Sequence, residues 1–250
     1  MTTHLYCVLP HQLRGAIPSG LSGVSGKTVR ALPVDGLVAW VSDVEREVAV
    51  STEGIRAHND VVEAAMQTGS TPVPARYGQR FDDDEACRAA LASRSASVES
   101  LLATMQGLVE MTVIITPSTG KMIRELEPVL PEMFDTEAEG AGRRYLDTLR
   151  KREARTGAIN HGTDEIGDRV AAAAEPIVRK TLVHQTLTPL PLRTVSHLVA
   201  RADVARYNEA IGAVAGGAEF RLLVIGPRAP YSFCALSSEA GGTHGMNLAG

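Results

Sequence analysis

The chain has 250 residues, of which 44% are hydrophobic, and its 25 basic and 29 acidic residues give a net charge of −4. A chain of this length builds one large domain or two small ones, and it buries roughly 70–75% of its unfolded surface without help from disulfides or metals. The small negative charge argues against a general nucleic-acid binder.

The cysteines and the N-terminus favour a soluble cytoplasmic protein. Cys7, Cys87 and Cys234 lie far apart and form no C-x-x-C pair, which indicates buried thiols in a reducing compartment. The first residues lack the charged region and long apolar run of a signal peptide. No apolar stretch approaches the ~20 residues of a membrane-spanning helix, so no membrane span is expected.

Three strands are expected near the N-terminus. Residues 4–9, 28–34 and 37–42 are rich in β-branched, aromatic and small apolar side chains. Asp35-Gly36 separates the second run from the third, and both positions tolerate positive φ, which predicts a hairpin.

The segment Gly23–Thr28 resembles the end of a phosphate-binding P-loop without completing it. That motif requires a glycine where Leu21 stands, and it must open a helix whose N-terminus faces the phosphates. The residues that follow, 29–34, favour a strand. We therefore expect no nucleotide site in this loop.

Helical patterns fill most of residues 51–107. The first helix, over 51–68, contains His58, which we expect at the surface or in packing because no second ligand stands three or four residues away. The second begins at Asp82 and Glu85, which have the spacing of a capping box. Residues 71–81, with two prolines, are expected to be extended.

From Leu108 onward the predicted order is strand, helix, strand, strand, helix, strand. Strands are expected over 108–116, 181–188, 193–200 and 220–225. Helices are expected over 141–155, over 164–177 and after Asp203. Gly157 and Gly162 interrupt the first of these helical patterns, and Pro176 ends or kinks the second helix. This order is that of the split βαβ, ferredoxin-like fold.

The sequence therefore predicts an α+β protein of two domains. A small α+β domain is expected over 1–107, and a ferredoxin-like (βαββαβ) domain with a long helical insertion over 108–236. The small, polar residues 237–250 are expected to form a flexible tail.

The stretch from Glu219 to Phe233 combines a strand with a stiff aromatic segment. Apolar residues on both alternating faces of 220–225 predict a strand covered on both sides and central in its sheet, ended by Gly226-Pro227. The aromatic tripeptide Tyr231-Ser232-Phe233 then either caps the core of its own domain or forms a docking surface for a partner.

Catalytic motifs are missing from the sequence, which favours a binding or structural role. An enzyme or small-molecule-binding protein stays open as the alternative, and it would require a pocket where side chains such as Glu110, His184 and His197 converge. His184 and His197 could approach each other across a hairpin, although two histidines make a weak metal site. The basic residues within 143–155 are either a solvated helix face or a docking site for an acidic partner. Nucleic-acid binding through this helix is a third alternative, and it predicts strongly salt-dependent binding.

Two segments resemble motifs of the gas vesicle GvpL/GvpF family. Residues 226–233, Gly-Pro-Arg-Ala-Pro-Tyr-Ser-Phe, resemble the family's GPWPPYSF signature, and 74–78, Pro-Ala-Arg-Tyr-Gly, resemble its PxRFG segment. Ala57-His58, Val109-Glu110 and Tyr145-Leu146 fit weaker family patterns in the same order. Arg228-Ala229 and Tyr77 depart from the family's usual Trp-Pro and Phe.

This resemblance implies a non-catalytic accessory protein of gas vesicle assembly, located in the cytoplasm and at the gas vesicle. Its implied partners are the small hydrophobic major shell protein (GvpA type) and other accessory gas vesicle proteins, with no nucleic acid, cofactor or metal. The candidate interaction residues are Pro74, Arg76, Tyr77, Gly78, Gly226, Pro227, Pro230, Tyr231, Ser232 and Phe233. They either dock the shell subunit or fix the two domains together.

Overall fold

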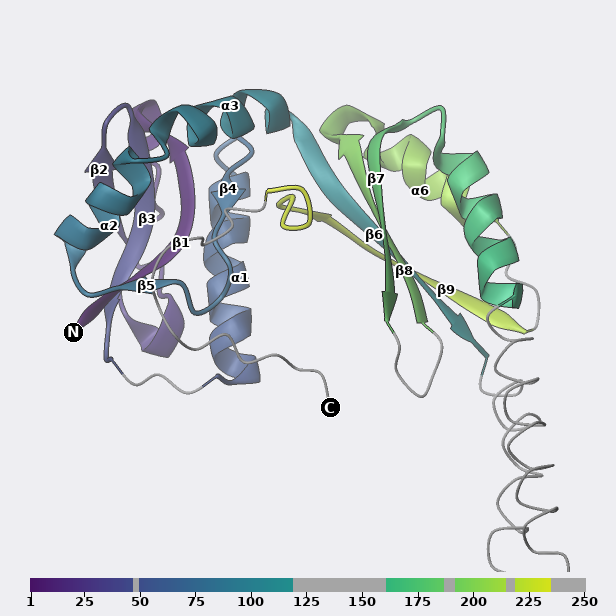
Figure 1. The fold of residues 1–250 in the computed structure, drawn as a ribbon, viewed down its shortest axis with the longest axis horizontal. Helices are drawn as coiled ribbons and strands as arrows, with labels where there is room; N and C mark the ends of the chain where they lie inside the picture. The colour runs from purple at the N-terminus through teal and green to yellow at the C-terminus, as the bar shows by residue number, and fades with distance from the viewer. Residues whose placement is uncertain (47–49, 119–160, 187–191, 215–218, 235–250) are drawn as a thin grey trace, which may run out of the picture. The chain divides into compact units, whose positions relative to one another are not determined.

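The structure, a computed structural model, describes residues 1–46, 50–118, 161–186, 192–214 and 219–234. The chain divides into two compact units (Figure 1). Unit 1 contains Met1–Thr68, Pro72–Thr104 and the described residues from Tyr231 onward, and unit 2 contains Gly69–Thr71 and Met105–Pro230. The aromatic residues after Pro230 thus group with unit 1, whereas the predicted second domain included them. The predicted limits after residues 107 and 236 stay a prediction.

Unit 1 is built on a five-stranded sheet of order β2-β3-β1-β4, with β5 also paired to β1. Its strands are β1 (Thr2–Pro10), β2 (Arg30–Val34), β3 (Leu37–Val44), β4 (Val73–Pro74) and β5 (Arg80–Phe81). Asp35 and Gly36 join β2 to β3 with φ of 28° and 77°, which confirms the predicted hairpin. The strand β2 also confirms that Gly23–Thr28 opens no α-helix.

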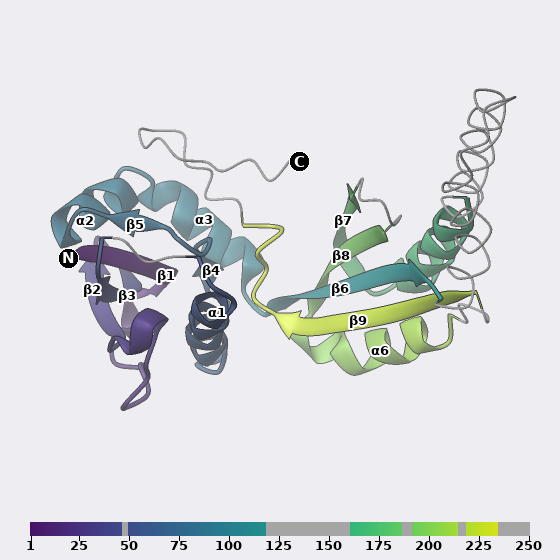
Figure 2. The same ribbon diagram turned by 90° about the horizontal axis from the view of Figure 1, so that it is seen from below.

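Helix α1 (Thr52–Met66) packs against this sheet. The Ser51 hydroxyl accepts a hydrogen bond from the Gly54 N–H at 3.0 Å, which caps the helix as its sequence predicted. Its buried face carries His58 together with four apolar residues, Val61, Val62, Ala65 and Met66. Figure 2 shows α1 nearly end-on, beside β1 and β4.

The single helix predicted from Asp82 toward Gly107 is two helices, α2 (Asp84–Ala92) and α3 (Ser95–Met105). Ser93 lies at the break, and its hydroxyl donates to the Ala90 carbonyl oxygen at 2.9 Å. Such local side-chain bonds to the backbone compete with helix continuation. The N-cap is Asp83, whose carboxylate accepts from the Ala86 N–H at 2.8 Å, rather than Asp82.

Unit 2 is built on a four-stranded antiparallel sheet of order β7-β8-β6-β9. The strands are β6 (Leu108–Pro117), β7 (Val178–Thr186), β8 (Leu192–Ala200) and β9 (Phe220–Arg228). With unit 1, this makes the chain a mixed α and β protein with two antiparallel sheets, which confirms the predicted class at that level.

Two helices cover one face of the unit 2 sheet. They are residues 161–174 and α6 (Val204–Gly212), drawn side by side in Figure 1. The core between them and the sheet is formed by Met111, Val113, Ile115, Ile166, Val170, Ala174, Ile177, Val199, Tyr207, Ile211 and Phe220. Gly162 was expected to interrupt the helical pattern of residues 141–155, before a second helix opening at Asp164 or Glu165. It lies instead within the helix of residues 161–174, where an added Cβ would meet the Phe220 ring. The helix ends before Pro176, as expected.

The strand β9 differs from its prediction in two ways. It lies at one edge of the sheet, and β6 and β8 are the central strands. It also continues through Gly226-Pro227 to Arg228. An edge strand tolerates a proline because the missing N–H can face outward. The side chain of Leu223 is 56% exposed, so the apolar run of this strand does not reflect cover on both faces.

All three cysteines are free and buried. Burial raises the pKa of Cys87 to about 12, and it raises the pKa of Cys7 still further. The helix predicted over 141–155, with its basic residues and Tyr145-Leu146, and the tail over 237–250 lie outside the described residues.

Candidate interaction site

The segment Pro74–Gly78 forms the end of β4 and a tight turn in unit 1. Pro74 pairs with Cys7 of β1, and the Ala75 N–H donates to the Tyr6 carbonyl oxygen at 2.8 Å. The turn is closed by the Gln79 N–H, which donates to the Arg76 carbonyl oxygen at 3.1 Å. Gly78, the third residue of this turn, has φ of 88°, a conformation that favours glycine.

Tyr77 of this turn packs against α1. Its ring lies 5.8 Å from the His58 ring, edge to face, and 5.9 Å from the His4 ring. A Cβ at position 54 would fall 2.3 Å from the Tyr77 hydroxyl oxygen, so the glycine in α1 leaves room for the tyrosine. The neighbouring Arg76 and Gly78 are exposed.

Two buried histidines support this turn from below. The distance from His4 Nε2 to His58 Nδ1 is 3.0 Å, and from His58 Nε2 to the Ala75 carbonyl oxygen it is also 3.0 Å. A carbonyl oxygen only accepts, so His58 carries its proton on Nε2 and its Nδ1 accepts from His4. This chain links β1, α1 and the segment after β4.

Both imidazoles are held neutral. Burial lowers the pKa of His4 to about 3, and the nearby His58 and Arg80 act in the same direction. Burial likewise lowers the pKa of His58 to about 4, although its bond to the Ala75 carbonyl opposes this. His58 is therefore a packing histidine, one of the two roles expected for it.

Tyr6 completes the cluster. Its ring lies 4.8 Å from the His4 ring and 5.2 Å from the His58 ring, and its hydroxyl accepts from the Val24 N–H at 2.8 Å. Neither His4 nor Tyr6 was predicted from the sequence to be a site residue. Their alternate positions on β1 place them on one face of the strand, and that pattern is the signal that could have identified them.

The end of the second motif also lies against α1. The Tyr231 hydroxyl donates to Asn59 Oδ1 at 3.1 Å, and Asn59 follows His58 in the helix. Tyr231 and Ser232 are half-buried, whereas Phe233 is only 7% exposed. The structure thus brings Tyr77 and Tyr231 to adjacent residues of one helix. Of the two aromatics of the motif, Phe233 is therefore buried and Tyr231 is half-buried.

The first half of that motif lies in unit 2. Gly226 has φ of 132°, and an added Cβ would lie 2.6 Å from the Glu110 carbonyl oxygen of β6, so only glycine fits there. The Gly226-Pro227 peptide bond is cis, and Pro230 is buried. These residues shape the end of β9 rather than belonging to the group on α1.

The residues considered for catalysis do not converge. Glu110 pairs with Leu198 and Met111 with His197, so Glu110 and His197 point to opposite faces of the sheet. His184 pairs with Thr194, and His197 with Thr181, so the two histidines are not opposite each other in the hairpin. His197 instead faces α6, where its Nδ1 lies 2.7 Å from the Tyr207 hydroxyl.

Within the parts of the chain that the structure covers, no group of three or more histidine, cysteine or acidic residues is placed to bind a metal ion. In the same residues, every helix is too short or too polar to cross a membrane.

Comparison with known proteins identifies the family. Residues 2–235 match the family model described as gas vesicle synthesis protein GvpL/GvpF. Two similar solved structures are the gas vesicle protein GvpF from Anabaena sp. PCC7120, with a TM-score of 0.71, and that from Microcystis aeruginosa, with a TM-score of 0.69. Each is 18% identical in sequence; the matches cover 96% and 94% of this chain and 99% of each of those chains. A search of curated protein sequences finds no match.

Proposed function

The chain belongs to the GvpL/GvpF family of gas vesicle synthesis proteins, and from that premise we propose that it is a non-catalytic accessory protein that binds the small hydrophobic shell subunit. A shell subunit with an apolar face aggregates unless a partner covers that face before assembly. The binding takes place in the cytoplasm, at the growing gas vesicle, together with other accessory gas vesicle proteins.

The observation that carries this proposal is the meeting of both family-like motifs on α1. We define the α1 surface as Ile55, Asn59, Arg76 and Tyr231. Ile55 is 40% exposed and lies one helical turn from Asn59, which holds the Tyr231 hydroxyl. An exposed isoleucine one helical turn from the asparagine that binds a half-buried tyrosine gives this surface apolar groups among polar ones, which suits an apolar partner.

The arrangement beneath this surface supports docking more than a purely structural role for Tyr231. The His4, His58 and Tyr77 cluster fixes the turn and α1 rigidly, so the exposed side chains above are preorganised for binding. Phe233 is the aromatic residue of this motif that packs in the interior, because it is buried. Glu110 and His197 lie on opposite faces of a strand pair, which favours the non-catalytic alternative.

We also infer that unit 2 is a ferredoxin-like domain. Its described elements follow the order strand, helix, strand, strand, helix, strand, and its antiparallel sheet has the order β7-β8-β6-β9. A domain of this class hosts many functions, so the proposal for binding depends on the α1 surface alone.

A pull-down with the purified shell subunit tests the function. An unrelated hydrophobic peptide serves as the control ligand, and Ile55→Lys and Tyr231→Ala are the test variants. Leu223→Lys is the matched control variant, because Leu223 is an apolar residue of unit 2 that is at least as exposed as Ile55. We expect the two test variants to lose most of the captured shell subunit while Leu223→Lys retains it. Equal capture by all four proteins would refute a binding role of the α1 surface.

A further inference from the structure

The strand β7 forms one edge of the unit 2 sheet. Among the described residues its only strand neighbour is β8. A β-bulge between Val178 and Lys180 interrupts the pairing at its start, and from Lys180 to Thr186 the register is regular. An edge with regular geometry presents a row of backbone donors and acceptors to an incoming strand.

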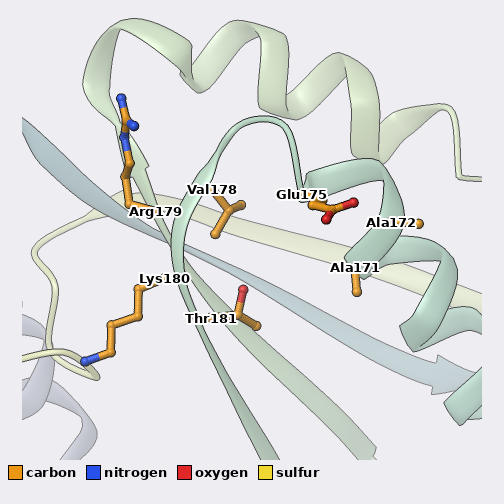
Figure 3. A pocket seen from close by; sticks show the side chains of 7 residues that line it. All are labelled: Ala171, Ala172, Glu175, Val178, Arg179, Lys180 and Thr181. Carbon is orange, nitrogen blue, oxygen red and sulfur yellow. The ribbon is translucent and has the colours of Figure 1, made fainter.

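A groove runs beside the beginning of this edge. It is open to solvent and has a volume of about 490 Å³. Ala171, Ala172 and Glu175 line one wall, and Val178–Thr181 line the other (Figure 3). The helical wall carries small alanine side chains, which leave space for the side chains of a strand laid along β7. A groove between a helix and a sheet edge is a recurring site for an added peptide strand.

The edge strand β7 also exposes an apolar side chain, Val183, on the face of the sheet that the helices cover. Val183 pairs with Val195, which is 2% exposed, yet Val183 itself is 52% exposed. The helices that cover β8 therefore do not reach β7 at this level. A strand added to the edge would bury Val183, and an apolar residue on that strand would be stabilised by the contact.

The charges around the groove restrict what fits there. Arg179 and Lys180 are exposed and form no ion pair with any residue that the structure describes. Figure 3 shows both side chains on the side of β7 away from Ala171 and Ala172, with that of Arg179 directed upward and that of Lys180 downward in this view. Glu175 on the opposite wall is a single acidic group against these two cations. An incoming segment is thus favoured if it carries acidic residues near the Arg179 end of the edge.

We propose that β7 is a second binding surface, which takes an extended segment of another protein as an added strand. This segment alternates apolar and polar residues and has acidic residues that face Arg179 and Lys180. Its apolar side chains cover Val183 and enter the groove beside Ala171 and Ala172. The proposal does not depend on the shell subunit or on the α1 surface, so each of the two proposals can fail alone.

The probe for this surface is a fluorescein-labelled synthetic peptide of alternating valine and threonine with two aspartates at one end. Fluorescence anisotropy with the full chain should show saturable binding, and amide hydrogen exchange should slow in β7 but not in β9. Val183→Lys should weaken binding at least tenfold, because a lysine blocks the edge. Lys180→Glu should weaken binding and reduce its sensitivity to salt.

Leu223→Lys is the matched control, since it places the same charge on the other edge of the same sheet, and it should bind like wild type. The folding of each variant is checked by thermal unfolding. Equal binding by Val183→Lys and Leu223→Lys, or equal binding of a peptide whose central valine is replaced by proline, would overturn the proposal. A dimer in solution that Val183→Lys alone dissociates, without any peptide binding, would instead assign the edge to a second copy of the chain.

Discussion

The two units treat a buried histidine differently. In unit 1, His58 is fully buried and both of its ring nitrogens are hydrogen-bonded, to His4 and to the Ala75 carbonyl. In unit 2, His197 is equally buried, but only Nδ1 has a partner, and Nε2 has none among the described residues. Unit 1 therefore uses its histidines to connect three segments, whereas unit 2 depends on apolar packing around a partly satisfied one. Unit 1 also contains a buried polar atom, Trp40 Nε1, that has no hydrogen-bond partner among the described residues.

This difference predicts a steeper pH dependence for unit 1. The pKa of His4 is lowered to about 3 and those of His58 and His197 to about 4, below the ordinary value of 6.5. Between these values the unfolded state binds the proton and the folded state does not. The contribution of each neutral histidine to the unfolding free energy is therefore fully present above pH 6.5. It decreases as the pH falls, by about 1.4 kcal/mol per pH unit for each histidine.

Among the residues that the structure describes, unit 1 has two such histidines and unit 2 has one, so we expect slopes of about 2.8 and about 1.4 kcal/mol per pH unit between pH 6 and 4.5. Trp40 is the single tryptophan and is buried in unit 1, so its fluorescence follows urea unfolding of that unit. Amide hydrogen exchange of β6 and β8 follows unit 2. Equal slopes in the two units would break the comparison.

The second prediction compares the same truncation in both units. His58→Ala leaves a cavity and removes the partner of both His4 and the Ala75 carbonyl oxygen, and it should cost about 4 kcal/mol of unfolding free energy. His197→Ala leaves a similar cavity but removes the partner of the Tyr207 hydroxyl alone. We expect its cost to be about 1–2 kcal/mol smaller. Urea unfolding at pH 7.5 measures both, and a larger cost for His197→Ala would contradict the role assigned to the unit 1 network.

A third prediction separates the two aromatics that unit 1 receives from the end of the chain. Phe233→Ala should cost about 3 kcal/mol, because the ring is only 7% exposed. Tyr231→Ala should cost less than about 1 kcal/mol, since its ring is half-buried and its hydroxyl bond to Asn59 is at the surface. Trp40 fluorescence during urea unfolding gives both values. Similar costs for the two variants would mean that Tyr231 has a structural role.

The smallest expected effect concerns helix caps. Asp83 caps α2 of unit 1 with a bond to the Ala86 N–H, whereas Asp203 precedes α6 of unit 2 without any side-chain cap bond. Asp83→Ala should cost about 1 kcal/mol, and Asp203→Ala only a few tenths. Paired melting curves of the two variants against wild type test this, and the comparison would fail at this level if Asp203→Ala shifted the melting temperature more.

Much of the fold follows from local sequence signals. The Asp35-Gly36 hairpin, the Ser51 cap of α1 and the end of a helix before Pro176 were all predicted, because each depends on the backbone preferences of one or two residues. The position of β9 was predicted wrongly. Its apolar run indicates burial on both faces, but an edge position depends on which strands pair, and that is decided by contacts distant in sequence.

The candidate site was predictable only in part. The two motifs and His58 were identified from sequence, yet their meeting on α1 depends on residues far apart in the chain, such as Asn59 and Tyr231. The break between α2 and α3 at Ser93 was not predicted. The sequence around a serine that bonds to its own helix backbone is the same as around a serine whose hydroxyl faces solvent. The hydrogen bond between His4 and His58 likewise leaves no pattern along the sequence.

The burial of Cys7, Cys87 and Cys234 has a chemical consequence. A thiol reacts as its thiolate, so a buried thiol with a raised pKa is inert to maleimides and to mild oxidants. Cys7 and Cys87 are unreactive for this reason, and Cys234 is shielded by its burial, so the native chain offers no accessible thiol without any cysteine being removed. A single Ile55→Cys or Val183→Cys substitution would then carry the only reactive sulfur, and a photo-crosslinker attached there would covalently capture whatever protein occupies that position during vesicle growth.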